Sequence, residues 1–217
     1  MTPRSALITP AISDYVIAHT EPPDEVMAAL IAETASLPEV NMQIAPDQAA
    51  LMTLLARSIN ARAAIEIGTF TGLSALAVAR ALPEDGSLLC CDVNAEWTAV
   101  ARRYWERAGV SNRIELRIGP AAQTLEALPE EPTYDFAFVD ADKTGYAGYI
   151  AALYPRMQTN ALVLLDNTLR GGRVLGSRET SADDAAMIAL NDQLITDVGW
   201  DTVLLPIADG LTLLRKR

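Results

Sequence analysis

Short apolar runs alternate with longer, helix-like stretches over most of the chain. Seven runs have the length of a β-strand: residues 63–68, 87–93, 114–119, 135–140, 161–167, 200–207 and 210–216. Helices are predicted to begin near Leu73, Ala95, Ala121 and Gly145 and, after a loop rich in glycine and arginine, near Ser181. Most of the first five runs are apolar on both faces, as is typical of parallel strands covered by helices on both sides. The pattern therefore predicts an α/β protein with a mostly parallel sheet.

The two ends of the chain add to this arrangement. Only a few residues around Asp209 separate the last two runs, and such a short link permits only an antiparallel hairpin. Residues 1–60 are expected to form three helices, divided by Pro22 and Pro23 and by a loop over residues 38–46.

The composition is that of a chain with a sizeable hydrophobic core. Half of the 217 residues are hydrophobic, no apolar run reaches the length of a membrane span, and no linker divides the sequence. We expect one domain over residues 1–217, in which the helices of 1–60 pack on a core formed by 61–217. The first residues do not resemble a signal peptide, and Cys90 and Cys91 would point to opposite faces of a strand. A cytoplasmic location without a disulfide is therefore expected.

The net charge and the histidine content limit which partners and which kinds of catalytic site are expected. The net charge of −11 argues against nucleic acids and anionic membranes as main partners. The single histidine, His19, leaves little basis for a Ser-His triad, a Cys-His pair or a zinc site built from histidine and cysteine. An enzyme of this composition would rely on carboxylates, lysines, amides and hydroxyls, which suit a hard divalent cation with oxygen ligands.

Acidic residues stand at or near the carboxyl ends of four predicted strands. They are Glu66, Asp92, Asp140 and Asp166. In a parallel sheet these ends lie along one edge, where doubly wound folds bind their ligands. We therefore expect the four carboxylates to converge on one crevice, where a ligand or cation would offset their mutual repulsion.

The turn after the first strand, E-I-G-T-F-T-G-L-S, has features of a ligand-binding loop. Gly68 and Gly72 permit a tight turn and the close approach of a ligand, and Ser74 lies at the start of a helix, where free N–H groups attract an anion. The alternative is a plain strand-to-helix turn capped by Thr71 or Ser74. The turn lacks G-x-G-x-x-G, the fingerprint of a dinucleotide pyrophosphate, and Asp92 is placed to bind both hydroxyls of a ribose. An adenosyl amino acid therefore fits better than NAD.

Asp140, Asp166 and Asn167 form a second group. Two carboxylates and an amide at adjacent strand ends supply three oxygen ligands and leave about three of the six positions of Mg²⁺ open. Mg²⁺ is the favoured ion, with Mn²⁺ and Ca²⁺ as alternatives. Lys143 is by frequency a surface lysine, but beside a cation in a partly dry crevice it would serve as a general base. As an alternative to a role in the site, Asn167 would cap a loop, and Asp142 would be a solvated turn residue.

Five motifs in this order resemble those of the cation-dependent class I O-methyltransferases, the group of the caffeoyl-CoA and catechol O-methyltransferases. The motifs are E-I-G-T-F-T-G-L-S, A-L-P-E-D-G, D-F-A-F-V-D-A-D-K, L-L-D-N-T-L and D-G-L-T-L-L-R-K, and the resemblance covers about residues 38–217. It implies a Rossmann-like seven-stranded sheet that ends in an antiparallel hairpin. It also implies S-adenosylmethionine as methyl donor, a divalent cation, a phenolic small molecule of the catechol type as acceptor, and a homodimer.

The resemblance also assigns roles to individual residues. Donor binding is implied for Met42, Glu66, Gly68, Thr69, Ser74, Asp92, Ala121 and Asp140, with Asp92 at the ribose and Ala121 near the adenine. The metal ligands would be Asp140, Asp166 and Asn167. Lys143 and Asp140 would be the catalytic residues, Lys143 taking the proton of the reacting hydroxyl.

Departures from the family's plant members concern the acceptor. Arg170 stands where the plant enzymes carry an aromatic residue that contacts the substrate, and Ile44 stands where they carry a hydroxyl residue near the metal. The segment G-S-R-E-T-S-A-D-D-A has no aromatic residue in place of their substrate-contacting tyrosines, so a CoA thioester is not assumed. Arg170, Arg173 and Arg178 are interpreted as part of a solvated loop, with contact to an acidic substrate group as the alternative.

Two other functions are compatible with a sheet of this kind. One is an NAD-dependent oxidoreductase, against which the missing G-x-G-x-x-G and the additional acids argue. The other is a non-catalytic dimer that binds an adenosyl ligand, against which the presence of Lys143 and of all three predicted metal ligands argues.

Overall fold

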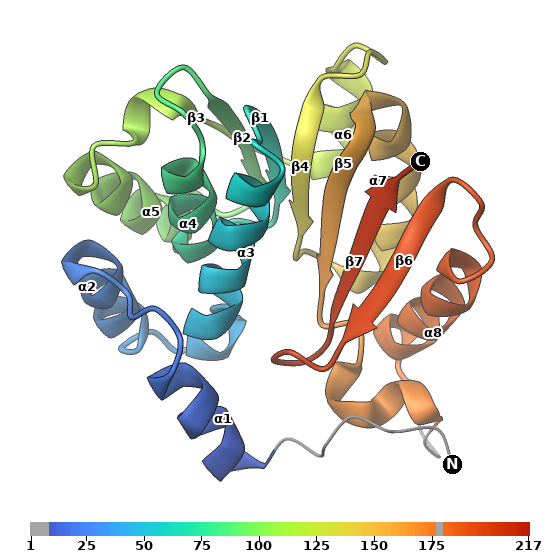
Figure 1. Ribbon diagram of the computed structural model, residues 1–217, viewed down its shortest axis with the longest axis horizontal. Helices are drawn as coiled ribbons and strands as arrows, with labels where there is room; N and C mark the ends of the chain where they lie inside the picture. The colour runs from blue at the N-terminus through green and yellow to red at the C-terminus, as the bar shows by residue number, and fades with distance from the viewer. Residues whose placement is uncertain (1–8, 177–179) are drawn as a thin grey trace.

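The computed structural model describes residues 9–176 and 180–217, which form a seven-stranded sheet with helices on both faces (Figure 1). The strand order is β3-β2-β1-β4-β5-β7-β6. The strands are β1 (Ala63–Ile67), β2 (Ser87–Asp92), β3 (Ile114–Ile118), β4 (Tyr134–Val139), β5 (Met157–Asp166), β6 (Trp200–Leu205) and β7 (Leu211–Lys216). Strands β1 to β5 pair in parallel, whereas β7 pairs antiparallel with both β5 and β6. The predicted mostly parallel sheet with a C-terminal antiparallel hairpin is confirmed.

Helices follow the strands where the sequence predicts them. They are α4 (Leu73–Ala81), α5 (Ala95–Arg107), α6 (Ala121–Ala127), α7 (Tyr146–Leu153) and α8 (Ala182–Leu194). The N-terminal helices are α1 (Pro10–Ala18), α2 (Glu25–Thr34) and α3 (Pro46–Ser58). Short 3₁₀ segments are η1 (Val40–Met42), η2 (Ser111–Arg113), η3 (Lys143–Gly145), η4 (Tyr154–Arg156) and η5 (Arg170–Leu175). Within the described residues, no helix has the length and hydropathy that crossing a bilayer requires.

Strand β5 begins earlier than its apolar run indicates. It starts at Met157 rather than near Ala161, because the exposed polar residues 158–160 are extended but carry no apolar signal. The pairing of β4 with β5 shifts register between Tyr134 and Phe136, beside this polar part of the strand.

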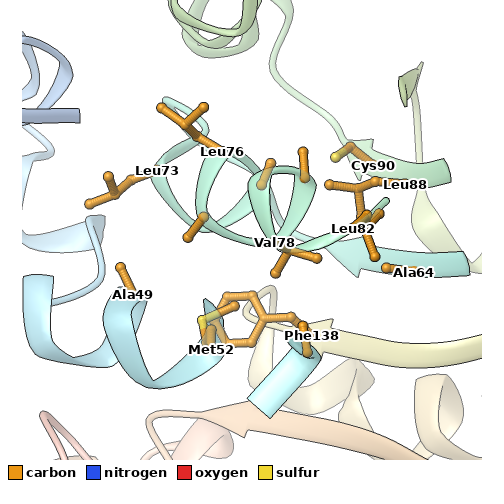
Figure 2. Close-up of a cluster of buried hydrophobic side chains, with 14 of the residues drawn as sticks. Ala49, Met52, Ala64, Leu73, Leu76, Val78, Leu82, Leu88, Cys90 and Phe138 are labelled. Carbon is orange, nitrogen blue, oxygen red and sulfur yellow. The ribbon is translucent and has the colours of Figure 1, made fainter. Parts of the chain in front are cut away.

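The sheet separates two apolar layers, because successive side chains of a strand point to opposite faces. On one face, Ala64, Leu88 and Phe138 pack against α3 and α4. Figure 2 shows Met52 of α3 beside the ring of Phe138, with Val78 of α4 above them. On the other face, strand residues alternate with these and pack against α6, α7 and α8. Burial on both faces explains why the central strands lack the polar alternation of a half-exposed sheet.

The strand order reverses direction between β1 and β4, where a crevice opens in doubly wound folds. Here the chain after β1 runs close to the chain after β4. Gly68 has a positive φ of 89°, and a Cβ atom at this position would lie 2.0 Å from the backbone oxygen of Asp140. Glycine is therefore required at the point where the two strand ends meet.

Candidate active site

A cavity of about 970 Å³ lies at the carboxyl ends of β1, β2, β4 and β5. This volume is near the upper end of the range for small-molecule sites, about 300 to 1,000 Å³. Besides the strand ends, the cavity is lined by the segment before α3, by the chain after β5 and by the tip of the β6–β7 hairpin. In Figure 1 these elements lie along the lower edge of the sheet.

The structure brings most of the predicted site residues to this cavity. Its lining includes Met42, Gly68, Asp92, Ala121, Asp140, Lys143, Asp166 and Asn167. Glu66, Thr69 and Ser74 are buried and do not belong to this lining. Three of the four strand-end acids thus reach the cavity, and the expected convergence is incomplete because Glu66 lies beneath the turn.

Glu66 is a buried acid without full compensation. Its side chain is 1% exposed, and one carboxyl oxygen has no hydrogen-bond partner among the described residues. Burial raises the pKa of Glu66 to about 8, and the neighbouring hydroxyls of Ser74 and Thr69 offset the shift only in part. Glu66 is therefore protonated in the folded protein near neutral pH.

We expect Glu66→Gln to flatten the dependence of stability on pH. In the unfolded chain Glu66 loses its proton near pH 4.5, whereas the folded protein keeps it up to about pH 8, so the free energy of unfolding should fall as pH rises through this interval. At about 1.4 kcal/mol per unit of pKa shift, the wild-type protein should lose on the order of 4 kcal/mol more than the variant between pH 5 and pH 8. Urea unfolding of both proteins at several pH values measures this difference. Equal slopes would show that Glu66 ionises normally when folded.

Asp92 holds the glycine-rich turn against the end of β2. Thr69 and Phe70 donate their backbone N–H groups to Asp92 Oδ2, each at 2.8 Å, and Asn94 donates its own to Oδ1 at 2.7 Å. A carboxylate offers about four acceptor sites, so Oδ1 retains capacity for a further donor from the cavity. A ribose hydroxyl is such a donor.

Two aromatic residues that the sequence analysis did not single out form a wall next to Asp92. Phe70 and Trp97 pack edge to face with ring centroids 5.2 Å apart, and both line the cavity. A signal for Trp97 exists in the sequence, because it lies in the first turn of the helix that follows Asp92 and so starts at the same edge of the sheet. The pair can cover an apolar or aromatic ligand group.

Lys143 is buried, at 7% exposure, so it is not the surface lysine of the frequency-based alternative. Its Nζ donates to Asp140 Oδ1 at 2.9 Å and to the hydroxyl of Tyr146 at 2.7 Å. The hydroxyl of Tyr146 lies 3.0 Å from the backbone oxygen of Val139 and 3.2 Å from that of Asp166. Lys143 is thus held at the ends of β4 and β5, facing the cavity.

Asp166 is a second buried carboxylate beside Asp140. It is 3% exposed, and its Oδ1 accepts the backbone N–H of Asn167 at 2.8 Å. Burial, followed by the charge of Asp140, raises the pKa of Asp166 to about 7. A cation between the two carboxylates would remove this repulsion, and Asn167 supplies an additional oxygen. Among the described residues no group of three or more histidine, cysteine, aspartate or glutamate side chains is placed to hold a metal ion, so a cation here would need the mixed set of Asp140, Asp166 and Asn167. This oxygen donor set is one that Mg²⁺ takes.

Of the arginines after β5, Arg170 is anchored in the wall of the cavity, whereas the side chain of Arg173 is paired but 48% exposed. Arg170 Nε lies 2.9 Å from Asp184 Oδ1, and Arg173 Nε lies 3.2 Å from the same atom. Both arginines line the cavity, and the side chain of Arg170 is only 17% exposed. The interpretation as a solvated loop is therefore wrong for Arg170, whereas Arg178 lies outside the described residues. The buried carboxylate of Asp184 fixes this wall of the cavity from behind.

Ile44, Asp142 and Tyr149 also line the cavity. Ile44 is buried and lines the cavity, so no hydroxyl is present at this position. Asp142 is exposed but accepts a hydrogen bond from the hydroxyl of Tyr149 at 2.6 Å, which makes it more than a free turn residue. Tyr149 borders the cavity and was not predicted from the sequence.

Comparisons with known proteins agree on one class of enzyme. Residues 18–217 match the family model described as O-methyltransferase. A relative from Dictyostelium discoideum, named probable caffeoyl-CoA O-methyltransferase 2, is 38% identical over 211 residues, which cover 95% of this chain and 91% of the relative.

Solved structures are similar over almost the whole chain. The SAH-bound methyltransferase PaMTH1 of Podospora anserina is 25% identical with a TM-score of 0.88, covering 99% of this chain and 100% of that one. The O-methyltransferase TomG of Streptomyces achromogenes, involved in tomaymycin synthesis and in complex with SAM, is 26% identical with a TM-score of 0.84, covering 95% and 96%.

Proposed function

Because the chain belongs to the O-methyltransferase family, and is an S-adenosylmethionine-dependent enzyme of the caffeoyl-CoA O-methyltransferase type, we propose that it methylates one hydroxyl of a vicinal diphenol beside a divalent cation. The relatives described above are methyltransferases and give no support to an NAD-dependent oxidoreductase or to a non-catalytic adenosyl-binding protein. The observation that carries the proposal is one cavity lined both by Asp92, on the donor side, and by Asp140, Lys143 and Asp166, on the acceptor side.

The donor would lie along the ends of β1 and β2. Asp92 binds the ribose through Oδ1, while Gly68 lets the methionine part approach the backbone. Ala121 would lie near the adenine, and Met42 borders the cavity in the segment before α3. Glu66, Thr69 and Ser74 support the turn from beneath, where they are buried.

The cation would be held by Asp140, Asp166 and Asn167. When bound there it would act as a Lewis acid and would stabilise a phenolate by several kcal/mol relative to a phenol with a pKa of about 10. Two adjacent acceptor oxygens, as in a diphenol, can occupy positions that the three protein ligands leave open.

Lys143 is the proton acceptor in this proposal. The proton of the reacting hydroxyl moves to the lone pair of Lys143 Nζ, whose position is fixed by Asp140 and Tyr146. The phenolate oxygen then forms a bond to the methyl carbon, and the electrons of the broken carbon–sulfur bond stay on sulfur. Opposite charges vanish in this step, so a site that excludes water favours it, and the fixed geometry lowers the entropy cost.

A transfer assay tests the proposal directly. We expect methylation of catechol or caffeate from S-adenosylmethionine, loss of activity with EDTA and recovery with Mg²⁺, detected by mass spectrometry. Full activity in EDTA would refute the cation dependence, and no transfer to any vicinal diphenol would refute the proposed acceptor class.

We further expect Asp92→Asn to weaken donor binding about 10- to 100-fold. The change removes a charged hydrogen-bond acceptor, which is typically worth about 1.5 to 3 kcal/mol. Isothermal titration with S-adenosylhomocysteine gives the dissociation constant. Glu115→Gln, which removes an exposed carboxylate paired with Arg117 on β3, is the matched control. A dissociation constant for Asp92→Asn within twofold of wild type would rule out the ribose contact.

A further inference from the structure

Gln48 is the most unusual polar residue in the wall of the cavity. It is fully buried, with 0% exposure, and neither its Oε1 nor its Nε2 has a hydrogen-bond partner among the described residues. A buried amide without partners is costly and uncommon, because the protein gives up the hydrogen bonds that water would make. An unpaired amide in the lining of a cavity points to a partner that enters the cavity.

The helix that carries Gln48 is firmly placed. Helix α3 begins at Pro46, so Gln48 lies in its first turn, near the carboxyl edge of the sheet. The next residue, Ala49, and Met52 one turn further on pack into the core against α4 and Phe138 (Figure 2). Burial alone would favour an apolar side chain at position 48 as well. The amide therefore needs an explanation that packing does not give.

Gln48 and Asp166 line the same cavity. The amide is near enough to act on this carboxyl group as a weak hydrogen-bond donor, although no hydrogen bond of regular geometry joins the two side chains. The other carboxylate, Asp140, is contacted by Lys143 at 2.9 Å. The two strand-end carboxylates therefore have different neighbours: a lysine at the end of β4 and a neutral amide at the end of β5.

We propose that Gln48 binds the acceptor hydroxyl that is not methylated and thereby determines which hydroxyl of the pair reacts. The inference rests on the proposed function. In a vicinal diphenol, one hydroxyl gives its proton to Lys143, whereas the other keeps its proton and needs a hydrogen-bond acceptor. Gln48 Oε1 is a neutral acceptor that cannot take the proton away, and Nε2 remains free to donate to Asp166.

The test compares Gln48→Met with wild type and with Gln158→Met. Methionine is close to glutamine in size but has no amide, and Gln158 is an exposed glutamine at the opposite end of β5. With caffeate, S-adenosylmethionine and Mg²⁺, Gln48→Met should raise the acceptor KM about tenfold, the effect of one lost hydrogen bond. It should also shift the two methylated isomers from one dominant product toward equal amounts. Gln158→Met should match wild type in both.

Two measurements do not depend on turnover. Affinity for S-adenosylhomocysteine should stay within twofold of wild type, because Gln48 lies on the acceptor side. The Tm of the ligand-free protein should rise by roughly 2 to 4 °C in Gln48→Met, since the unpaired amide is removed from the interior. A lower Tm combined with weaker donor binding would assign Gln48 a structural role and overturn the inference.

The outcomes separate the two proposals. If wild type methylates diphenols and Gln48→Met keeps its KM and isomer ratio within twofold, the inference fails while the proposed function stands. An equal mixture of isomers from wild type would also overturn the inference. No transfer by wild type to any vicinal diphenol would refute the proposed function and, with it, the role of Gln48.

Discussion

Replacing Asp166 by asparagine is expected to lower methyl transfer to a catechol by about 10³-fold in kcat/KM. The substitution keeps the shape of the side chain and an oxygen that can accept the backbone N–H of Asn167, but it removes one of the two carboxylates at the ends of β4 and β5. A divalent cation would then have a single carboxylate ligand, and the several kcal/mol by which it would stabilise a phenolate should be largely lost. A factor of 10³ corresponds to about 4 kcal/mol of transition-state stabilisation. Initial rates over a range of Mg²⁺ and acceptor concentrations measure the effect.

Two controls accompany this prediction: the affinity of the variant for the donor product, and the activity of a variant at a second aspartate. Affinity of Asp166→Asn for S-adenosylhomocysteine should remain within about threefold of wild type, because Asp166 lies on the acceptor side of the cavity. Asp201→Asn, on β6, removes a carboxylate that pairs with Arg215 and Arg217 and should leave activity unchanged. Wild-type activity in Asp166→Asn at limiting Mg²⁺ would eliminate Asp166 as a cation ligand.

Replacing Lys143 by methionine is the second change with a large expected effect. Methionine keeps the apolar stem that packs on the ring of Tyr146, whose centroid lies 4.8 Å from Nζ, but it has no group that takes a proton. Loss of a positioned general base typically costs about 10² to 10⁴ in rate. The deficit should shrink as pH rises toward the phenol pKa of about 10, because more acceptor is then ionised in solution. Profiles of kcat/KM against pH for wild type and variant measure both features.

Lys216→Met is a matched control for Lys143→Met. Lys216 also lies against a tyrosine, with Nζ 4.5 Å from the centroid of the Tyr154 ring, and it donates to the backbone oxygens of Tyr154 and Met157 at the opposite end of the sheet. Its substitution should leave the pH profile unchanged. A deficit in Lys143→Met that stays constant from pH 7 to pH 10 would mean that Lys143 acts through its charge on Asp140 rather than as a base.

The strands and the edge of the sheet were predictable because each carries a local signal. A buried parallel strand must be apolar on both faces, so the runs that end at Asp92, Asp140 and Asp166 identify both the strand and its carboxyl end. Parallel pairing then brings those ends together without any knowledge of distances. The early start of β5 was missed because its first residues are polar and exposed.

How deeply each side chain of the site is buried, and which distant residues it contacts, was not predictable from the sequence. Strand position places Glu66 at the same edge as Asp92, but the turn over Gly68 and Gly72 covers it, and only three-dimensional packing determines this. Burial of Lys143 and the ion pairs of Arg170 with Asp184 depend on contacts between distant segments. Gln48 gives no signal at all in the sequence, since one glutamine in the first turn of a helix normally faces solvent.

The central claim is that carboxylates from the ends of β4 and β5 hold one divalent cation beside the methyl donor. A crystal grown with Mn²⁺ and S-adenosylhomocysteine, and measured for anomalous scattering, tests this claim most directly. We predict a single Mn²⁺ peak bonded to Asp140, Asp166 and Asn167, with the sulfur of S-adenosylhomocysteine in the same cavity. Electron density for the donor product without a Mn²⁺ peak at these three residues would contradict the account.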